Sequence, residues 1–418
     1  MKYAQVIISI PTRQIDRPFD YAIPQALEAE VQLGTKVEVP FGSKTVEGYV
    51  VGLNDSTKVD PEKIKTIRAV AQDAQPIPLE LLKLATWLAS FYQCLYLDAL
   101  RLVLPAWTQT TERKVKTAAL ASPISEEEVA QMTKTSPKQA AILKALSEHG
   151  PLSVQELIEL ADCTAAPLHS LAKKGKVQLA LKPQRRHAMA KVSSTFCRPT
   201  LTGQQKQAIE TLAELPEGGV GLLWGITGSG KTEVYLNLIQ QKLDSGKAAI
   251  TLVPEIALTP QMVARYRSRF GDQVAVLHSQ LGAGERRDEW ERVRTGEARV
   301  VLGPRSALFA PIDDLGLIII DEEHEPSYKQ EAPPRYHARE CAIKRAEFAG
   351  AQVVLGSATP SLESFYKAQR SDFQLVSLTQ RPTGQKLPQI QLVDMRQELK
   401  HGNRSMFSWS LQESLKEC

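Results

Sequence analysis

Apolar and polar positions alternate differently in three parts of the chain, and the first part is typical of a β-rich domain. Over residues 1–105, short apolar or alternating runs are separated by Pro and Gly, as expected of strands joined by turns. Examples are YAQVIISI, FDYAIP, TKVEVPFG and EGYVVGL. A later stretch, PLELLKLATWLASFYQ, has apolar residues three and four positions apart, which predicts a helix. We therefore expect a β-rich domain over residues 1–107.

The second part predicts a linker followed by a small helical module. Residues 108–135 are mostly polar, whereas the stretch after Ser136 carries three short helical patterns. Ser153 and Glu156 have the spacing of a capping box at the start of the second helix. A final run, KVQLALKP, is interpreted as a β-wing, so a winged-helix domain is expected within residues 108–185. Winged helices bind DNA, bind proteins or act only as spacers, and the pattern leaves these roles open.

In the third part, over residues 198–372, continuous apolar runs alternate with amphipathic helices. The strand-like runs include VGLLWGI, AAITLVP, QVAVLHS, ARVVLG, LGLIIID and AQVVLGSATP. Strands that are apolar throughout and separated by helices predict a doubly wound parallel sheet that is buried on both faces. The expected fold class is thus a multidomain α/β protein.

Composition and charge narrow the class of protein. A chain of 418 residues is too long for one ordinary core. Its 43% hydrophobic and 23% charged residues are typical of a soluble globular protein. The longest apolar runs are far shorter than the roughly 20 residues that cross a bilayer, and the N-terminus has no recognisable secretory signal. A cytoplasmic protein without a membrane partner is therefore expected. The net charge of +4 permits nucleic-acid binding without demonstrating it.

The cysteines are scattered and form no C-x-x-C pair. This spacing argues against a disulfide framework and against a complete cysteine zinc site. Unpaired thiols in a reducing compartment are the favoured interpretation. The five residues are Cys94, Cys163, Cys197, Cys341 and Cys418.

Residues 225–232, GITGSGKT, fit the phosphate-binding pattern G-x-x-x-x-G-K-[ST] in full. The motif follows a predicted strand and opens a predicted helix, which is the context that the pattern requires. Lys231 is expected to neutralise the β- and γ-phosphates, and the Thr232 hydroxyl to bind Mg²⁺. A chance Gly-rich turn is the weaker alternative. The predicted nucleotide-binding residues here are Gly225, Thr227, Gly228, Ser229, Gly230, Lys231 and Thr232.

An apolar run that ends in acids, LGLIIIDEEH, predicts the other half of the nucleotide site. Asp321 is expected to hold Mg²⁺, and Glu322 to orient or polarise the attacking water. His324 either couples this site to a second ligand or is an ordinary hydrogen-bonded histidine. A solvated acidic turn is the alternative, and the phosphate motif upstream weighs against it. The predicted catalytic residues are Lys231, Asp321, Glu322 and His324.

Further segments occur in the order of the motifs of superfamily-two helicases, which this part of the chain resembles. They are VPEIALTPQ (253–261), GPRSALFAP (303–311), DEEH (321–324) and GSATPSLES (356–364). The resemblance implies a RecA-like helicase lobe in which Ser357, Ala358 and Thr359 couple the nucleotide to DNA. LTGQQKQAI lies ahead of the phosphate motif, where such helicases read adenine, so Gln205 is implied to contact the base.

The N-terminal runs extend the resemblance to one family over essentially the whole chain. RPFDYAIP, VEVPFG and GYVVGL, followed by WGITGSGKTEVY, DEEHEPSYKQE and LGSATPSLES, are similar to segments of the PriA family of bacterial replication-restart helicases. The resemblance implies an ATP-dependent 3′-to-5′ DNA helicase that recognises and remodels stalled forks and helps to reload the replicative helicase. The implied cofactors are ATP and Mg²⁺. The implied partners are forked or branched DNA with a nascent 3′ end, single-stranded DNA, primosome and helicase-loading proteins, and single-stranded-DNA-binding protein.

The resemblance also implies that the first domain captures the 3′ end of a nascent DNA strand. Aromatic residues suit a terminal base, a carboxylate suits the free 3′-hydroxyl, and a lysine suits a phosphate. Without the resemblance, packing of FDY into a core would be the better interpretation, because strand aromatics are usually packing residues. The implied pocket residues are Phe19, Asp20, Tyr21, Gly42 and Lys65.

Aromatic and basic residues follow DEEH closely, and the resemblance implies that they stack on bases and meet phosphates. Pro304 stands where family members commonly have Thr, which removes a hydroxyl and a backbone donor. Many members also have a Trp near the position of Pro334, so stacking here rests on tyrosine. The implied DNA-binding residues in this half of the chain are Arg305, Ser306, Tyr328, Lys329, Arg335, Tyr336, His337 and Arg339.

Residues 373–418 are interpreted as the start of an incomplete second lobe. They contain no QxxGRxGR-like segment and none of the zinc-binding cysteines of the family, so the zinc expected for the full-length family has no ligands here. Removing an arginine finger costs about 10³–10⁵ in rate in related NTPases. Three interpretations stay open: a helicase, a truncated non-hydrolysing module that binds ATP and fork DNA, and an unrelated P-loop ATPase with a regulatory winged helix.

Overall fold

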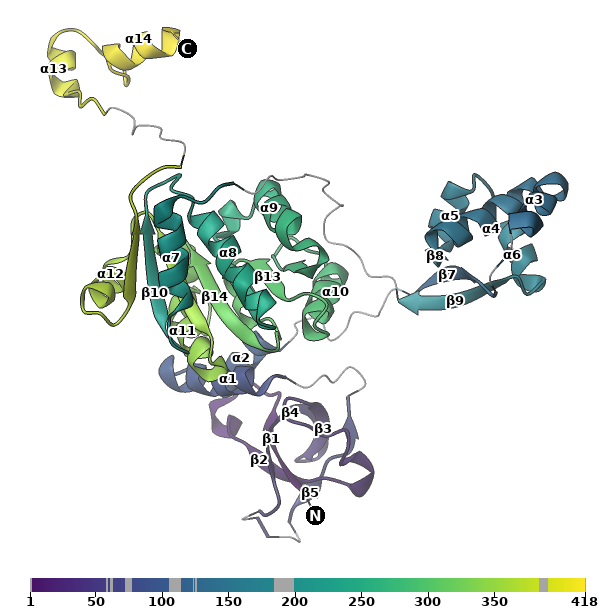
Figure 1. The fold of residues 1–418 in the computed structure, drawn as a ribbon. Coiled ribbons are helices and arrows are strands. Elements are labelled where there is room, and N and C mark those ends of the chain that lie inside the picture. Colours follow the sequence, from purple (N-terminus) through teal and green to yellow (C-terminus); the bar gives the residue numbers. More distant parts are fainter. Residues whose placement is uncertain are drawn as a thin grey trace.

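The computed structural model (Figure 1) shows a β-rich N-terminal unit, a small mixed unit and a large parallel-sheet lobe. Cys197 and Cys418, two of the predicted free thiols, lie outside the residues that it describes. The described residues are 2–57, 59–60, 63–71, 77–104, 114–122, 124, 126–183, 199–382 and 390–417.

The N-terminal unit is a six-stranded sheet in the order β5-β2-β1-β4-β3-β6. Its inward positions hold small and branched apolar side chains, among them Val6, Val37 and Val50, which form a core of their own. The elements are β1 (Tyr3–Ile8), β2 (Phe19–Ala22), β3 (Lys36–Phe41), β4 (Lys44–Asn54), β5 (Lys65–Thr66) and β6 (Ala69–Val70), with the short helices η1 (Arg13–Ile15) and η2 (Gln25–Leu27).

Two helices, α1 (Leu79–Phe91) and α2 (Tyr96–Val103), follow this sheet. The carboxylate of Asp16 accepts hydrogen bonds from the backbone N–H groups of Tyr96 (2.7 Å) and Leu97 (3.2 Å), so it occupies donors that a helix N-terminus leaves free. The apolar sides of both helices, including Leu81, Leu84, Leu88 and Leu100, belong to the same buried cluster as one face of the large lobe.

The small unit covers residues 114–183 and corrects one prediction. β7 (Lys114–Leu120) pairs with β8 (Leu152–Ser153) and β9 (Val177–Pro183), so residues 114–120 are not part of a linker. Polarity misled the interpretation, because KVKTAAL alternates like an exposed strand. Both hydrogen bonds of the capping box between Ser153 and Glu156 are present, at 3.2 and 3.1 Å. The helices are α3 (Glu126–Thr135), α4 (Pro137–His149), α5 (Val154–Leu160) and α6 (Ala165–Lys173).

The large lobe is a seven-stranded parallel sheet in the order β12-β13-β11-β14-β15-β10-β16, which confirms the predicted doubly wound fold. Its central strands are buried throughout, as expected when helices cover both faces. The strands are β10 (Val220–Gly225), β11 (Ala248–Leu252), β12 (Val274–Val276), β13 (Val300–Gly303), β14 (Leu315–Asp321), β15 (Gln352–Ser357) and β16 (Gln374–Leu378).

Helices pack on both faces of this sheet (Figure 1). One buried cluster joins the sheet to α7 (Gly203–Ala213), α8 (Lys231–Asp244) and α9 (Pro260–Phe270). The other joins it to α10 (Ala283–Arg294), α11 (Ala338–Ala349) and α12 (Leu362–Gln369), together with α1 and α2. Short helices of the lobe are η3 (Glu255–Ala257), η4 (Gly271–Gln273), η5 (Arg305–Phe309) and η6 (Pro326–Tyr328).

Strand β16 corrects the predicted end of the lobe. It pairs in parallel with β10 from Gly221 to Gly225, so FQLVSL completes the first sheet rather than beginning a second one. The sequence could not show this because an apolar strand carries no mark of the sheet to which it pairs. Two helices, α13 (Met395–Lys400) and α14 (Trp409–Glu417), follow.

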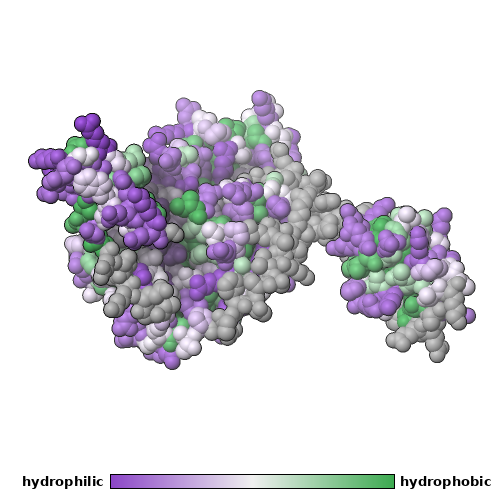
Figure 2. All heavy atoms as spheres, turned by 90° about the horizontal axis from the view of Figure 1, so that it is seen from above, coloured by the Kyte–Doolittle hydropathy of each residue, from purple (hydrophilic) through white to green (hydrophobic). Residues whose placement is uncertain are grey.

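The surface is of mixed polarity. Figure 2 shows one face on which hydrophobic residues form small patches among hydrophilic ones. Within the part of the chain that the structure describes, every helix is too short or too polar to span a membrane.

Candidate nucleotide-binding and DNA-binding sites

The phosphate motif forms the turn between β10 and α8. Gly228 and Gly230 have positive φ angles of 80° and 84°, which favour glycine and let the backbone curl at this point. The turn borders a cavity of about 420 Å³ at the carboxyl end of the sheet. The cavity is lined by Pro199, Thr200, Gln205, Ile226, Thr227, Gly228, Ser229, Gly230, Lys231, Thr232, Glu233, Arg265, Asp321, Glu322 and Pro382.

The polar groups in this cavity suit a phosphate ligand. Lys231 is 9% exposed, and its Nζ donates a hydrogen bond to the carbonyl oxygen of Gly225 at 2.9 Å. The same Nζ lies 3.7 Å from Oε1 of Glu322. Among the described residues, the buried hydroxyl of Ser229 has no hydrogen-bond partner. A buried cation and an unsatisfied donor at a helix N-terminus are groups that an anionic phosphate would satisfy.

Gln205 lies in the first turn of α7, beside the phosphate turn. Its side-chain amide donates to the carbonyl oxygen of Ser229 (2.9 Å) and accepts from the backbone N–H of Thr202 (2.9 Å), closing a capping box at the start of α7. The residue is buried, and both ends of its amide are engaged. Gln205 thus supports the phosphate turn and also lines the nucleotide cavity, and its contact with the base stays a prediction.

Asp321 stands at the end of β14 and is held by two tyrosines. The Tyr235 hydroxyl donates to its carboxylate at 2.9 Å, and the Tyr328 hydroxyl donates to its carbonyl oxygen at 2.7 Å. Burial, with a contribution from neighbouring Glu322, raises the pKa of Asp321. A cation placed beside this carboxylate would favour its charged form. Thr232 lines the same cavity, so both predicted Mg²⁺ ligands face one space.

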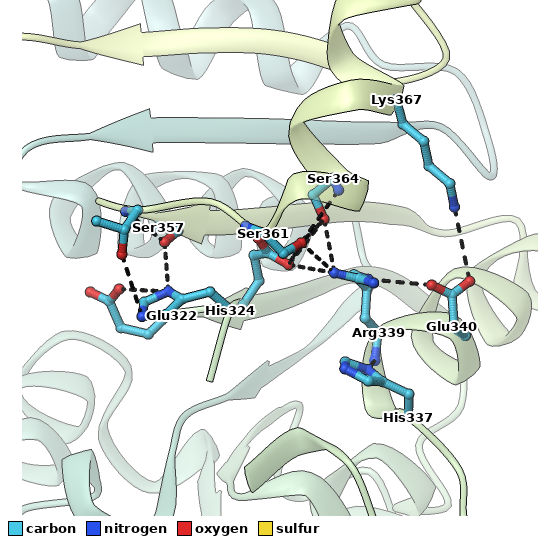
Figure 3. A network of polar contacts seen from close by, with 11 residues as sticks. Glu322, His324, His337, Arg339, Glu340, Ser357, Ser361, Ser364 and Lys367 are labelled. Atoms are coloured by element: carbon cyan, nitrogen blue, oxygen red, sulfur yellow. Dashed lines mark hydrogen bonds and ion pairs between the residues drawn. The ribbon is translucent and has the colours of Figure 1, made fainter. Parts of the chain in front are cut away.

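The residues after Asp321 contact the segment after β15. The Nδ1 atom of His324 lies 2.8 Å from the Ser357 hydroxyl and 3.7 Å from Oε2 of Glu322 (Figure 3). Ser357 also accepts the backbone N–H of Thr359 at 3.0 Å, and Thr359 Oγ1 lies 3.5 Å from Nε2 of His324. Glu322 has a φ of 46°, a conformation that a non-glycine residue adopts at a cost. The structure thus brings Glu322, His324, Ser357 and Thr359 together.

Ala358, the third residue predicted to couple the sites, contributes through its backbone. Its carbonyl oxygen accepts a hydrogen bond from the indole N–H of Trp224 at 3.1 Å. The Trp224 ring packs edge-on against Phe365 of α12, with ring centroids 5.7 Å apart. This contact ties the segment after β15 to the end of β10, next to the phosphate motif.

Four of the five predicted 3′-end residues are accessible on the N-terminal unit. Lys65 donates to the carbonyl oxygen of Gly42 at 3.4 Å, and β5 pairs with β2 at Tyr21. The carboxylate of Asp20 accepts from the Thr57 hydroxyl at 2.7 Å. Phe19 is half-buried and packs edge-on against Phe41 (5.5 Å between centroids).

Tyr21, the fifth residue of this set, faces inward. It is 3% exposed, belongs to the core of the unit and donates to the carbonyl oxygen of Pro40 at 3.3 Å. Burial raises the pKa of its hydroxyl. The structure therefore places Tyr21 as a packing residue, which is the interpretation favoured by the residues alone. Of the two aromatic residues, only Phe19 is accessible to a DNA base.

The segment between DEEH and α11 was predicted to display two tyrosines to DNA, and the structure corrects this. Tyr328 and Tyr336 are 1% and 2% exposed and belong to the large buried cluster. Both residues line a cavity of about 290 Å³. The other lining residues are Leu102, Val253, Pro254, Glu255, Ser279, Pro304, Arg305, Ser306, Ser327 and Gln330.

Basic side chains in and beside this segment donate hydrogen bonds to backbone carbonyl groups. Arg305 donates to the carbonyl oxygens of Ser327 (2.8 Å) and Lys329 (2.6 Å), and Lys329 donates to that of Arg335 (2.6 Å). Arg335 and Ser306 are exposed. Lys329 is exposed as well, and the Nε of Arg335 donates to the carbonyl oxygen of Glu331 at 3.0 Å. Arg305 therefore holds the segment in place, while Lys329, Arg335 and Ser306 are the groups exposed to a DNA strand.

His337 ends the segment and caps α11. Its Nδ1 accepts the backbone N–H of Arg339 at 3.2 Å, and its own backbone N–H donates to the Tyr92 hydroxyl at 3.0 Å. Burial, reinforced by Arg339, lowers the pKa of His337. Nδ1 is thus an acceptor in this structure, and the ring is a structural cap rather than a free stacking surface.

Sequence analysis did not predict the roles of three residues of this region and gave a fourth a different role. The three have no assigned place in a motif: Tyr92 at the end of α1, Tyr235 on α8, and Glu323. The fourth, Arg339, was expected to contact a DNA phosphate. Arg339 is buried and pairs with Glu323 at 2.9 Å. Only the third acid of DEEH, followed by an arginine sixteen positions later, offered a signal for this pair.

Two family models match the chain. Residues 5–105 match the PriA 3′DNA-binding domain (3′BD), and residues 202–368 match the DEAD/DEAH box helicase family.

Similar proteins carry one description. Replication restart protein PriA of Bacillus subtilis is 38% identical over 487 residues, an alignment that covers 100% of this chain and 60% of that protein. The protein of the same name from Synechocystis is 35% identical and is covered to 59%, with 99% of this chain aligned. The chain thus spans about 60% of the length of these curated relatives.

Solved structures also resemble part of the chain. RecG bound to a three-way DNA junction matches 49% of this chain and 27% of its own, with 25% identity and a TM-score of 0.36. The Hef helicase domain of Pyrococcus furiosus matches 42% of this chain and 37% of its own, with 19% identity and a TM-score of 0.33.

Proposed function

The chain belongs to the PriA family of replication restart proteins. From this membership and the geometry of its sites, we propose that it binds ATP and forked DNA as part of an ATP-dependent 3′-to-5′ DNA helicase. In this proposal the complete protein recognises and remodels stalled replication forks. It also promotes primosome assembly and reloading of the replicative helicase. Its partners are primosome and helicase-loading proteins and single-stranded-DNA-binding protein, in the cytoplasm.

One observation carries the nucleotide part of the proposal. Lys231, Thr232, Asp321 and Glu322 line one cavity at the carboxyl end of a parallel sheet, although the two pairs are about ninety positions apart in the chain. Bound Mg·ATP would supply a phosphoryl group and a metal that stabilises its developing charge. Lys231 would neutralise the β- and γ-phosphates, while Thr232 and Asp321 would hold the metal. Glu322 would orient the water.

His324 has a positioning role in this proposal. Its ring lies between Glu322 and Ser357, so a shift of the segment after β15 would reach the water-orienting carboxylate through one side chain. Ser357, Ala358 and Thr359 would in this way report DNA contact to the nucleotide.

The DNA part of the proposal uses two surfaces. On the N-terminal unit, Phe19, Asp20, Gly42 and Lys65 would receive a nascent 3′ end, with Asp20 accepting a hydrogen bond from the free hydroxyl. On the lobe, Ser306, Lys329 and Arg335 would contact the strand beside the cavity that Arg305 lines. Exposed polar and basic groups at a phosphate backbone give affinity without sequence preference.

Binding and hydrolysis assays separate this proposal from its alternatives. The 418-residue chain should bind a fluorescent ATP analogue in the presence of Mg²⁺, and Lys231→Ala should remove that binding while DNA affinity is kept. DNA-stimulated ATP hydrolysis would favour an active enzyme. Binding of both ligands without turnover would favour the non-hydrolysing module, and binding of nucleotide without fork DNA would favour an unrelated ATPase.

A further inference from the structure

The wall of the nucleotide cavity carries an ion pair outside the phosphate motif. Glu233, in the first turn of α8, and Arg265, on α9, both line the cavity. Nη2 of Arg265 donates to Oε2 of Glu233 at 3.3 Å, which is longer than the roughly 2.7–2.9 Å of a strong N⁺–H···O⁻ hydrogen bond. Among the described residues that line the cavity, Lys231 and Arg265 are the two with cationic side chains.

The two members of this pair differ in exposure. The side chain of Glu233 is 6% exposed, and its Oε1 accepts a hydrogen bond from Nδ2 of Asn237 at 3.2 Å. The side chain of Arg265 is 39% exposed. The carboxylate is thus fixed in the wall, whereas the guanidinium can turn toward a ligand in the cavity by changing its own rotamer.

A second arginine allows Arg265 to turn without stranding the carboxylate. Arg269 lies one turn further along α9, with its Nη1 3.6 Å from Oε1 of Glu233, and its Nη2 donates to Oδ1 of Asn237 at 3.2 Å. Its side chain is 9% exposed, and it is not among the residues that line the cavity. A buried carboxylate that loses its counter-ion is strongly destabilising, and Arg269 keeps Glu233 paired when Arg265 moves.

We infer that Arg265 is a further nucleotide-binding residue, whose guanidinium donates to a phosphate that ATP and ADP share. The inference rests on the proposed function and extends it to a residue outside the motifs. The backbone of a phosphate motif cradles the α- and β-phosphates, while its lysine reaches the β- and γ-phosphates. Glu233 directly follows the motif, so Arg265 beside its carboxylate lies on the side of the phosphates that ADP retains. The planar fork of a guanidinium suits two phosphate oxygens at once.

The test compares two nucleotides on the same chain. Isothermal titration calorimetry measures the affinity of the 418-residue chain for ADP and for a non-hydrolysable ATP analogue, both with Mg²⁺. Arg265→Gln should weaken both by about tenfold or more, because a hydrogen bond to a charged group contributes roughly this factor. Arg265→Lys keeps a cation without the planar fork, so its affinities should fall between those of the wild type and of Arg265→Gln.

Two further variants separate contact from indirect effects. Arg267→Gln is the matched control, because it removes a positive charge from α9 at a residue that does not line the cavity, and it should bind both nucleotides as the wild type does. Arg265→Gln alone leaves the charge of Glu233 facing the phosphates, and this repulsion would weaken binding without any contact. The double variant Glu233→Gln with Arg265→Gln removes both charges, and its affinities should still lie well below those of the wild type.

The outcomes distinguish the inference from the function on which it rests. Wild-type affinity in the double variant overturns the inference, because it shows that Arg265 only neutralises Glu233. Since that variant strands no charge, it also decides the question if Arg265→Gln does not fold. A loss confined to the ATP analogue overturns the inference as well, because it places the contact at the γ-phosphate. Both results leave the proposed function standing, whereas failure of the wild-type chain to bind either nucleotide overturns that function and the inference with it.

Discussion

Arg345 on α11 is fully buried, and its Nη2 lies 2.6 Å from Oε1 of Glu80 on α1. The same guanidinium donates to the carbonyl oxygens of Leu308 and Ala310, which belong to η5 or follow it. One arginine therefore ties the helices that follow the N-terminal sheet to the face of the lobe that carries Arg305. The position of the N-terminal unit relative to the lobe depends on this buried charge as well as on apolar packing.

Glu80→Ala should destabilise the chain strongly. It leaves Arg345 charged and buried without a counter-ion, a change that typically costs about 3–5 kcal/mol. Urea denaturation followed by circular dichroism measures the loss. Glu347→Ala is the matched control, because its ion pair with Lys344 is partly exposed and should be worth less than about 1 kcal/mol. Similar losses in both variants would show that burial of the pair has no special weight.

The sequence predicted the parts of the fold and the site that follow from local rules. The parallel sheet follows from apolar strands between helices, and the turn at Gly228 and Gly230 follows from a motif whose spacing is set by the backbone. The capping box at Ser153 needs only four consecutive residues. Each of these features is encoded within a short window of the chain.

Features that depend on distant packing were not predictable in the same way. Gln205 is part of a helicase-like motif, but its hydrogen bond to the carbonyl oxygen of Ser229 could not be predicted, because only the fold brings the two residues together. Tyr328 and Tyr336 look like stacking residues in the sequence, but the helices after the N-terminal sheet help to cover them. In a sequence, an aromatic residue next to basic residues can belong either to a hydrophobic core or to a DNA-binding surface, and only its burial in the fold distinguishes the two.

Gly356→Ala should destabilise the lobe, because a Cβ at this position would overlap the hydroxyl of Tyr235. Both residues are buried, so neither can move without disturbing the sheet, and overpacking of this kind typically costs about 1–3 kcal/mol. Thermal and urea unfolding measure the effect. Gly203→Ala serves as control, since it meets open space and should change stability by less than about 0.5 kcal/mol. Equal stability of both variants would contradict the close contact.

Relief by a second substitution would identify the cause. Tyr235→Phe removes the overlapping hydroxyl, so the double variant should recover part of the stability that Gly356→Ala loses. Strict additivity of the two losses would instead show that the two side chains do not interact.

His337 should make stability depend on pH. Its pKa is lowered from the ordinary 6.5, so the unfolded chain binds a proton more readily than the folded chain. Stability is complete above the ordinary pKa and falls as the pH drops from there through the lowered one. His337→Asn keeps a good N-cap without a titrating ring, so it should lose less stability between about pH 7.5 and about pH 5.5.

A parallel substitution isolates this effect from other titrating groups. His401 is exposed on the segment after α13, and His401→Asn should leave the pH dependence of the wild-type chain in place. Equal pH dependence in the wild type and in His337→Asn would show that the cap tolerates protonation.

Asp20 should give the chain its preference for a free 3′ end. Its carboxylate already accepts one hydrogen bond, from Thr57 at 2.7 Å, and its second oxygen can accept another from a 3′-hydroxyl. Hydrogen bonds to charged groups contribute about 1.5–3 kcal/mol, which corresponds to roughly tenfold or more in affinity. Fluorescence anisotropy with forks that end in a 3′-hydroxyl or a 3′-dideoxy nucleotide measures this preference. It should fall markedly in Asp20→Asn and persist in Asp55→Asn, an exposed carboxylate two residues before Thr57. If the wild-type chain binds both forks equally, Asp20 does not accept a hydrogen bond from the 3′-hydroxyl, and the proposed 3′-end pocket is wrong.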